Sequence, residues 1–270
     1  MKALRVATVP YWNIEPFLRS LSRLVPCEIE RGAPAALPVL ERSGRFDLCM
    51  LSAADLLRRG EAALDGACIS SDGPVGSVFL SSERPPDVWR VVGLDAASST
   101  SAELARIVVE RVLGIEPKFR RVADPDSERA RSECHAALRI GDRALRMARQ
   151  RVHLDLGWAW QRIAGLPFVY AAWVRGPRSL RSREELEAIL RAAREGSMRE
   201  AAAAASDGAR ALGIEVSRMR RYYAEQIRYH FDDAERQGLA RFGSLLPSPH
   251  FEGAAPRSPF EEIRLARRRA

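Results

Sequence analysis

The chain has 270 residues, of which 46% are hydrophobic and 29% charged, a composition typical of a globular protein with one large domain or two lobes. It contains no run of about 18 apolar residues, which argues against a transmembrane helix. Its net charge of +8 comes from arginines that lie beside glutamates without a groove-reading motif. This argues against nucleic-acid binding and leaves either a basic solvated surface or a modest attraction for small anions.

The first third of the chain alternates between predicted strands and helices. Residues 1–10 are too interrupted for a secretory leader and read as a strand, so we expect a cytoplasmic protein. The predicted strands are 4–9, 27–31 and 46–51, and the predicted helices are 16–24, 35–42 and 52–60. This order predicts parallel strands with crossover helices, and such sheets bind ligands beyond the carboxyl ends of their strands. Tyr11, Asn13 and Ser52 lie at those ends.

A turn that contains Asp72 and Gly76 leads into an apolar strand predicted at 75–81. Ser77 lies where the turn becomes strand. Its hydroxyl either bonds to nearby backbone or faces a ligand cleft, and both interpretations remain open. The proline-rich stretch 83–87 that follows predicts the point at which the chain crosses from one lobe to the other.

A run of hydroxyl residues follows the next predicted strand, at 89–94. The run is Ser98, Ser99, Thr100 and Ser101, and it opens a helix that Gly114 closes. Hydroxyls and free backbone N–H groups at a helix N-terminus suit a carboxylate or phosphate ligand. Ordinary capping is the alternative, although it needs only one such residue.

Further strands are predicted at 118–122 and 136–140. The second of these ends in Gly141 and Asp142, directly before a helix predicted at 143–149. The Asp142 carboxylate either contacts a ligand hydroxyl or caps this helix, and the residues alone leave both interpretations open.

An apolar run at 165–174 predicts a strand that returns the chain to the first lobe. Helices are predicted at 182–195, 198–212 and from near 217, the last with an apolar stripe that we interpret as core: Met219, Tyr223, Ile227, Phe231 and Ala234. The basic tail beyond Gly243 is expected to be flexible. We therefore expect lobe I to comprise residues 1–86 and 170–270, and lobe II residues 87–169.

The cysteines and histidines do not predict a metal site. The four cysteines have no C-x-x-C spacing, and the four histidines form no H-x-x-x-H pair. Cys27, Cys49 and Cys68 lie in apolar settings, which is typical of buried thiols in a reducing compartment.

Two α/β lobes joined by a double crossing resemble the type II periplasmic-binding-protein fold. We therefore expect each lobe to be a mixed, mostly parallel sheet flanked by helices, with the ligand cleft between the lobes. Six segments in chain order also resemble the chorismate dehydratases of the futalosine route to menaquinone. They are Tyr11-x-Asn13-x-x-Pro16, Asp72-Gly-Pro-Val-Gly-Ser77-Val78, Leu94-Asp95 followed by Ser98-Ser-Thr-Ser101, Ile140-Gly141-Asp142-x-Ala-Leu145, Asp155-Leu-Gly157 and Leu166-Pro-Phe-Val-x-Ala-x-Trp173. The tail from Leu245 onward has no counterpart in this pattern.

The resemblance implies a cytoplasmic lyase without cofactor or metal that converts chorismate, a small dianion, to 3-[(1-carboxyvinyl)oxy]benzoate and water. It implies no nucleic-acid or membrane partner and leaves a homodimer open. A sister enzyme of the same fold, 1,4-dihydroxy-6-naphthoate synthase, typically carries Pro-Asn-Asp in its first loop. This chain has Trp12-Asn13-Ile14 there, which favours the dehydratase. A non-catalytic sensor for small anions is a further alternative.

The implied reaction removes a ring hydroxyl and the neighbouring hydrogen, and aromatisation drives it. The resembling segments contain no evident general base, so our hypothesis is that the enolpyruvyl carboxylate of the substrate assists proton removal while Asn13 orients a reacting group. Asp142 is a costly alternative base beside a dianion. The expected substrate-binding residues are Tyr11, Ser52, Ser77, Ser99, Thr100, Ser101, Gly141 and Asp142.

Overall fold

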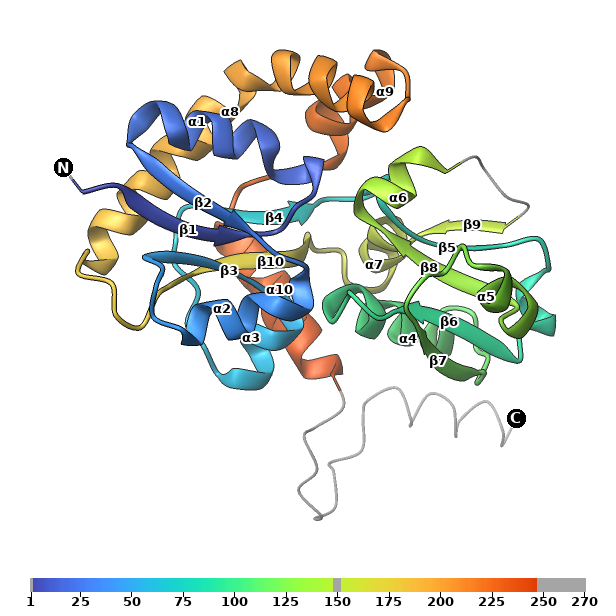
Figure 1. Ribbon diagram of the computed structural model, residues 1–270. Helices are drawn as coiled ribbons and strands as arrows, with labels where there is room; N and C mark the ends of the chain where they lie inside the picture. Colours follow the sequence, from blue (N-terminus) through green and yellow to red (C-terminus); the bar gives the residue numbers. More distant parts are fainter. Residues whose placement is uncertain (1, 148–151, 247–270) are drawn as a thin grey trace, which may run out of the picture.

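The computed structural model describes residues 2–147 and 152–246, which form two α/β lobes that lie side by side (Figure 1). The tail that we expected to be flexible lies, from residue 247 onward, outside the described residues. Within the described ranges, no helix combines the length and the apolar character needed to cross a membrane.

Lobe I is built on a five-stranded sheet in the order β2-β1-β3-β10-β4. Its strands are β1 (Leu4–Thr8), β2 (Cys27–Arg31), β3 (Leu48–Ser52), β4 (Cys68–Ser71) and β10 (Phe168–Arg175). β1 pairs in parallel with β2 and β3, as the alternating pattern predicted. β10, the strand that returns from lobe II, lies between β3 and β4 and is antiparallel to both.

Helices cover both faces of this sheet (Figure 1). They are α1 (Glu15–Leu24), α2 (Leu37–Arg42), α3 (Ala53–Arg59), α8 (Arg183–Leu212) and α10 (Asp233–Leu245). α1 and α8 pack together on one face, and α2, α3 and α10 cover the other (Figure 1). Both layers bury apolar side chains against the sheet, and Phe17 of α1 stacks on Trp173 of β10 at 5.7 Å between ring centroids.

Lobe II is a second five-stranded sheet in the order β7-β6-β8-β5-β9. Its strands are β5 (Val78–Ser82), β6 (Val91–Asp95), β7 (Lys118–Val122), β8 (Ala136–Ile140) and β9 (Val152–Asp155), and its helices are α4 (Thr100–Arg111), α5 (Glu128–Glu133), α6 (Gly141–Arg146) and α7 (Leu156–Ala164). β6 is parallel to β7 and β8, whereas β5 is antiparallel to β8 and β9. Both described sheets are thus mixed, with parallel and antiparallel pairs in equal number rather than mostly parallel.

The first crossing between the lobes lies before β5, at residues 72–77. The crossing expected at 83–87 is therefore wrong, because β5 pairs with β8 and β9 and belongs to lobe II. The proline-rich stretch instead turns back within lobe II through a short 3-10 helix, Pro86–Val88. The indole of the buried Trp89 fixes this turn by donating to the Arg84 carbonyl at 3.0 Å.

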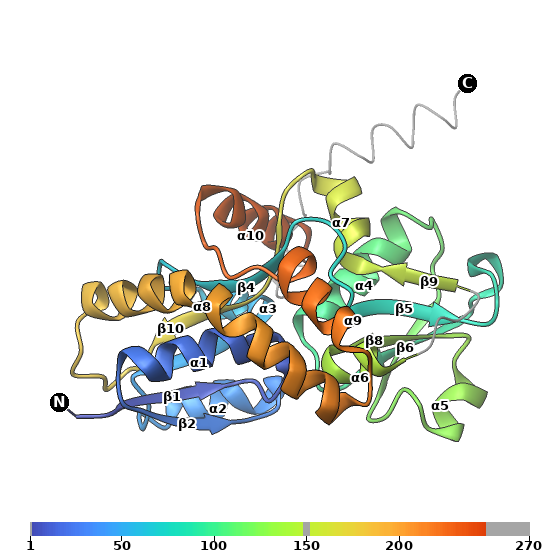
Figure 2. The same ribbon diagram turned by 90° about the horizontal axis from the view of Figure 1, so that it is seen from above.

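The helix expected from near residue 217 to Ala234 is wrong. The chain forms α9 (Val216–Arg221), a π-helical turn (Tyr222–Gln226), an extended segment and then α10. The helix ends because the backbone N–H and carbonyl of Arg228 pair with Ser70 of β4. Apart from the exposed Ala234, the stripe is buried as expected. Figure 2 shows α9 over the junction of the two lobes.

Candidate active site

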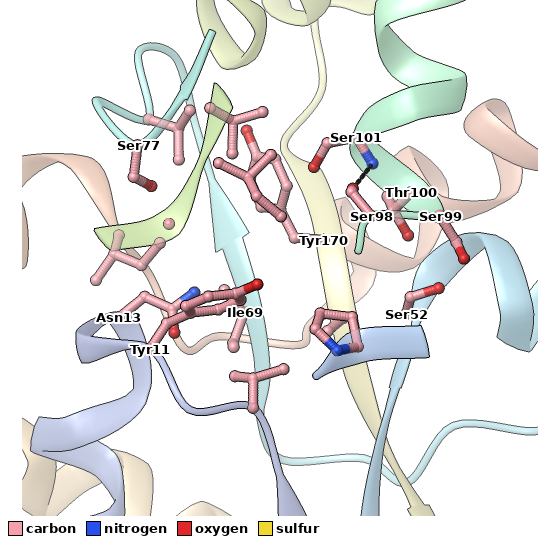
Figure 3. A pocket seen from close by; sticks show the side chains of 18 of the residues that line it. Tyr11, Asn13, Ser52, Ile69, Ser77, Ser98, Ser99, Thr100, Ser101 and Tyr170 are labelled. Carbon is pink, nitrogen blue, oxygen red and sulfur yellow. Dashed lines mark hydrogen bonds between the residues drawn. The ribbon is translucent and has the colours of Figure 1, made fainter. Parts of the chain in front are cut away.

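A pocket that is partly open to solvent lies between the lobes. All the site residues expected from the sequence line it except Asp142: Tyr11, Asn13, Ser52, Ser77, Ser99, Thr100, Ser101 and Gly141. In Figure 3, Ser99, Thr100 and Ser101 lie on one side of the pocket, and Tyr11, Asn13 and Ser77 lie on the other.

The loop after β1 carries Tyr11 and Asn13 into the pocket. The Oδ1 atom of Asn13 is buried and has no hydrogen-bond partner among the described residues. Leaving such an acceptor unpaired costs about 1–3 kcal/mol, so this atom is suited to a hydrogen donated by a ligand. Burial, with the nearby carboxylates of Asp95 and Asp142, raises the pKa of the Tyr11 hydroxyl to about 12, which keeps it a donor at neutral pH.

The hydroxyl run at the start of α4 divides into structural and available groups. Ser98 caps the helix, since its Oγ accepts from the Ser101 N–H at 3.1 Å (Figure 3). Thr100 Oγ1 accepts from the Ala54 N–H of α3 at 3.0 Å and so joins the two lobes. The hydroxyls of Ser99 and Ser101 have no hydrogen-bond partner in the part of the chain that the structure describes. The capping interpretation therefore holds for Ser98, and Ser99 and Ser101 stay candidates for binding a ligand.

Ser77 lies at the crossing, and not in a wall of lobe I as we expected. Its Oγ is 2.9 Å from the hydroxyl of Tyr222, which belongs to the π-helical turn. Either hydroxyl can be the donor of this bond, and donation by Tyr222 leaves the hydrogen of Ser77 for a ligand. Tyr222 was missed from the sequence, since its partner is 145 residues away.

The crossing segment is fixed by one carboxylate. Asp155 accepts from the N–H groups of Val75 and Gly76, with the shortest distance 2.7 Å, and also from Gly157 and Trp158 at the start of α7. The sequence motif Asp155-Leu-Gly157 thus has a structural role. It caps α7 and holds the backbone that presents Ser77.

Ser52 and Asp142 make contacts that differ from a simple ligand-binding role. The Ser52 hydroxyl accepts from the Asp55 N–H and donates to the Asp55 carboxylate, so it caps α3 while it lines the pocket. Asp142 neither lines the pocket nor caps its own helix. Its carboxylate accepts from the Trp12 N–H of lobe I at 3.0 Å, and burial raises its pKa.

The polar groups of the described residues that line the pocket are neutral. Within residues 2–147 and 152–246, the lining includes no lysine, arginine, histidine or cysteine, and it offers hydroxyls, the Asn13 amide and backbone groups. Tyr170 of β10, which the sequence did not single out, also lines it. Such donors can hold carboxylates by directional hydrogen bonds. Among the described residues, no cluster of histidine, cysteine, aspartate or glutamate could hold a metal ion.

Two mixed α/β lobes, a double crossing and a pocket between them define a protein of the periplasmic-binding-protein fold. A family model described as menaquinone biosynthesis matches residues 4–247, and the chain belongs to that family. The fold and the family expected from the sequence are thus confirmed.

Relatives extend this result. The chain is 27% identical over 261 residues to the chorismate dehydratase of Thermus thermophilus, a match that covers 88% of this chain and 93% of that protein. A solved Archaeoglobus fulgidus protein superposes with a TM-score of 0.66 at 14% identity, over 90% of this chain and 96% of the other. The periplasmic aliphatic sulphonate-binding protein SsuA of Escherichia coli gives 0.62 at 13% identity, over 98% and 94%. At these identities the two structures show the fold alone.

Proposed function

We propose that this chain is a chorismate dehydratase, which converts chorismate to 3-[(1-carboxyvinyl)oxy]benzoate and water for menaquinone biosynthesis. The proposal includes a cytoplasmic location and a reaction without a resident cofactor. The observation that carries it is the buried, unpaired Oδ1 of Asn13 in an interlobe pocket lined by neutral hydrogen-bond donors. The family and the Thermus thermophilus relative support it.

The chemistry starts at the ring carbon that bears the enolpyruvyl ether. The enolpyruvyl carboxylate takes the hydrogen of this carbon, and the electron pair spreads through the diene onto the ring carboxylate. The neighbouring C–O bond then breaks, the ring becomes aromatic, and the departing hydroxyl takes the proton to leave as water. No base from the protein is required.

The pocket residues would support both halves of this step. The hydroxyls of Ser99 and Ser101, two residues that line the pocket, would stabilise a carboxylate that gains charge. Asn13 Oδ1 would accept from the hydroxyl of the substrate, because a carboxylate has no hydrogen to donate to it. This assigns Asn13 to orienting the leaving group rather than the reacting carboxylate.

The test incubates purified protein with chorismate and follows ultraviolet absorbance, with chromatography and mass spectrometry of the product. We expect an aromatic product that is lighter by one water and retains its enolpyruvyl ether. Chorismate that binds but stays unchanged would overturn the proposal in favour of a binding or sensor protein. Formation of 1,4-dihydroxy-6-naphthoate from that enzyme's own precursor would overturn it in favour of the sister activity.

A further inference from the structure

The peptide units of Trp12 and Asn13 are gripped by buried side chains that lie outside the pocket. Tyr223 donates its hydroxyl hydrogen to the Trp12 carbonyl at 2.8 Å, and Tyr229 donates to the Asn13 carbonyl at 2.6 Å. Asp142 accepts from the Trp12 N–H on the side of lobe II. Neither tyrosine lines the pocket between the lobes, and both are less than one-tenth exposed.

The two tyrosines are themselves fixed by the backbone that carries them. Tyr223 lies in the π-helical turn, and irregular turns of this kind occur frequently at functional sites. Tyr229 lies in the extended segment beside β4, where its carbonyl accepts from the Cys68 N–H at 3.0 Å. Alternate residues of an extended segment face the same side, so Ile227 and Tyr229 share one face of it. Ile227 lines the pocket, and Tyr229 contacts the nearby Asn13 carbonyl.

Burial keeps both hydroxyls in the donor form. It raises the pKa of Tyr223 and of Tyr229 well above the usual value for tyrosine, so neither ionises near neutral pH. Each phenol therefore fixes one backbone carbonyl permanently, and the two bonds together limit the rotation of the Asn13 backbone. The side-chain amide of Asn13 is then presented at one fixed place in the pocket.

We infer that Tyr223 and Tyr229 are positioning residues for Asn13, which they hold in the orientation that the dehydration needs. The inference rests on the proposed function. It separates these tyrosines from Tyr222, whose hydroxyl bonds to Ser77 and not to the Asn13 loop. All three are buried phenols of the same chain segment, so Tyr222 is a matched control.

The experiment compares Tyr229→Phe, Tyr223→Phe and Tyr222→Phe, each alone and combined with Asn13→Ala. We expect Tyr229→Phe to lower kcat by about tenfold or more with KM changed by less than about threefold, because misplacing a group costs turnover rather than affinity. In the Asn13→Ala background the same change should have no further effect on kcat. Tyr222→Phe should mainly raise KM, and should do so in both backgrounds.

Three results would overturn the inference. One is an unchanged kcat in both Tyr223→Phe and Tyr229→Phe, and another is a loss that multiplies with that of Asn13→Ala. The third is a loss shared equally by Tyr222→Phe, which would indicate general loosening of the fold. If Asn13→Ala has no measurable turnover, the single variants decide: the inference requires that Tyr229→Phe lowers kcat and that Tyr222→Phe mainly raises KM. Wild-type protein that forms no product would instead remove the proposed function itself, a result visible before any variant is made.

Discussion

Asn13 is the only asparagine in the 270 residues of the chain. It stands at the one place in the described pocket lining where a buried amide oxygen is left without a partner. Serine and threonine offer a hydroxyl that can rotate, whereas a side-chain amide presents a donor and an acceptor in one rigid plane. A rigid plane suits a site in which a leaving hydroxyl must be held in one orientation.

Asn13→Ala should lower kcat by about 100-fold while KM changes by only a few-fold, since orientation contributes mainly to the transition state. Steady-state kinetics on purified variants measure both constants. Asn13→Gln is the control, because it keeps the amide and moves it by one methylene. A kcat within twofold of wild type in Asn13→Ala would remove this residue from the chemistry.

The serines at the start of α4 should separate binding from stability. Ser101→Ala should weaken chorismate binding by about 1–3 kcal/mol and leave the melting temperature nearly unchanged, because its hydroxyl has no partner within the described chain. Ser98→Ala should lower the free energy of unfolding by about 1 kcal/mol through the lost cap. Thermal melts and KM values test both. Equal effects of the two substitutions on affinity would contradict this division.

Asp142 predicts a pH-dependent stability. Burial raises the pKa of its carboxyl above the ordinary 3.8, so the folded state favours the protonated form. The stability that the protein gains by holding Asp142 in its protonated form is present below pH 3.8 and is lost as pH rises through the folded-state pKa. Asp142→Asn carries no such charge and can still accept from Trp12. Its melting temperature should therefore match wild type at low pH and exceed it progressively at higher pH. A difference that does not vary with pH would contradict this assignment.

At the scale of elements, the start of α7 packs directly against the crossing segment, and no space is left between them for a side chain on Gly157. A Cβ atom on Gly157 would lie 2.4 Å from the Gly73 carbonyl and 2.8 Å from Ser71 Oγ. Backbone cannot move aside as a flexible side chain can, so a methyl group there must displace residues 72–77. Ser77 would move with them.

Gly157→Ala should therefore destabilise the protein by about 1–3 kcal/mol and also raise KM. Gly176→Ala is the matched control, because its Cβ would lie 1.9 Å from the Phe46 carbonyl in lobe I, a residue that does not line the pocket. We expect the control to lose stability by denaturant unfolding and to keep its KM. An unchanged KM in Gly157→Ala would show that the crossing does not position Ser77.

Local pattern predicted most elements but not their partners. The strands predicted at 118–122 and 136–140 match the structure. β4 was missed because Cys68–Ser71 is short and half serine, and it is held in the sheet by β10 from far along the chain. The crossing was misplaced because prolines at 85 and 86 mark a turn but do not say which sheet follows it. The break after α9 was not predicted because Tyr223, Ile227 and Phe231 are four residues apart. This spacing places them on one face of a helix and also on one face of an extended segment.

The site shows the same limit. Pattern reasoning found the loop with Tyr11 and Asn13 and the hydroxyl run, because strand ends and helix starts are visible in sequence. It could not assign the hydroxyls, since the partner of Thr100 is Ala54, on the other lobe. Tyr223 was interpreted only as core and Tyr229 was not singled out, because their bonds to Trp12 and Asn13 span more than 200 residues.

At the scale of the whole molecule, the lobes differ in how they use the chain. The described strands of lobe II come from one continuous stretch, β5 to β9. Lobe I takes β1 to β4 from before that stretch and β10 from after it. α8 and α10, which cover opposite faces of the lobe I sheet, also come from after it (Figure 1). The net charge of +8 does not come from the described pocket lining, which holds no cation.

This division sets an order of assembly during synthesis. Lobe II has all of its described strands once residue 155 has left the ribosome, and domains generally fold as units in the order of their emergence. The sheet of lobe I must then wait with β3 and β4 unpaired along the edges that β10 will fill. α1 must wait longer, for α8. The part of the protein made first is therefore finished last, and a nascent chain that has emerged from the ribosome only as far as about residue 165 exposes two unpaired strand edges in lobe I beside a formed lobe II.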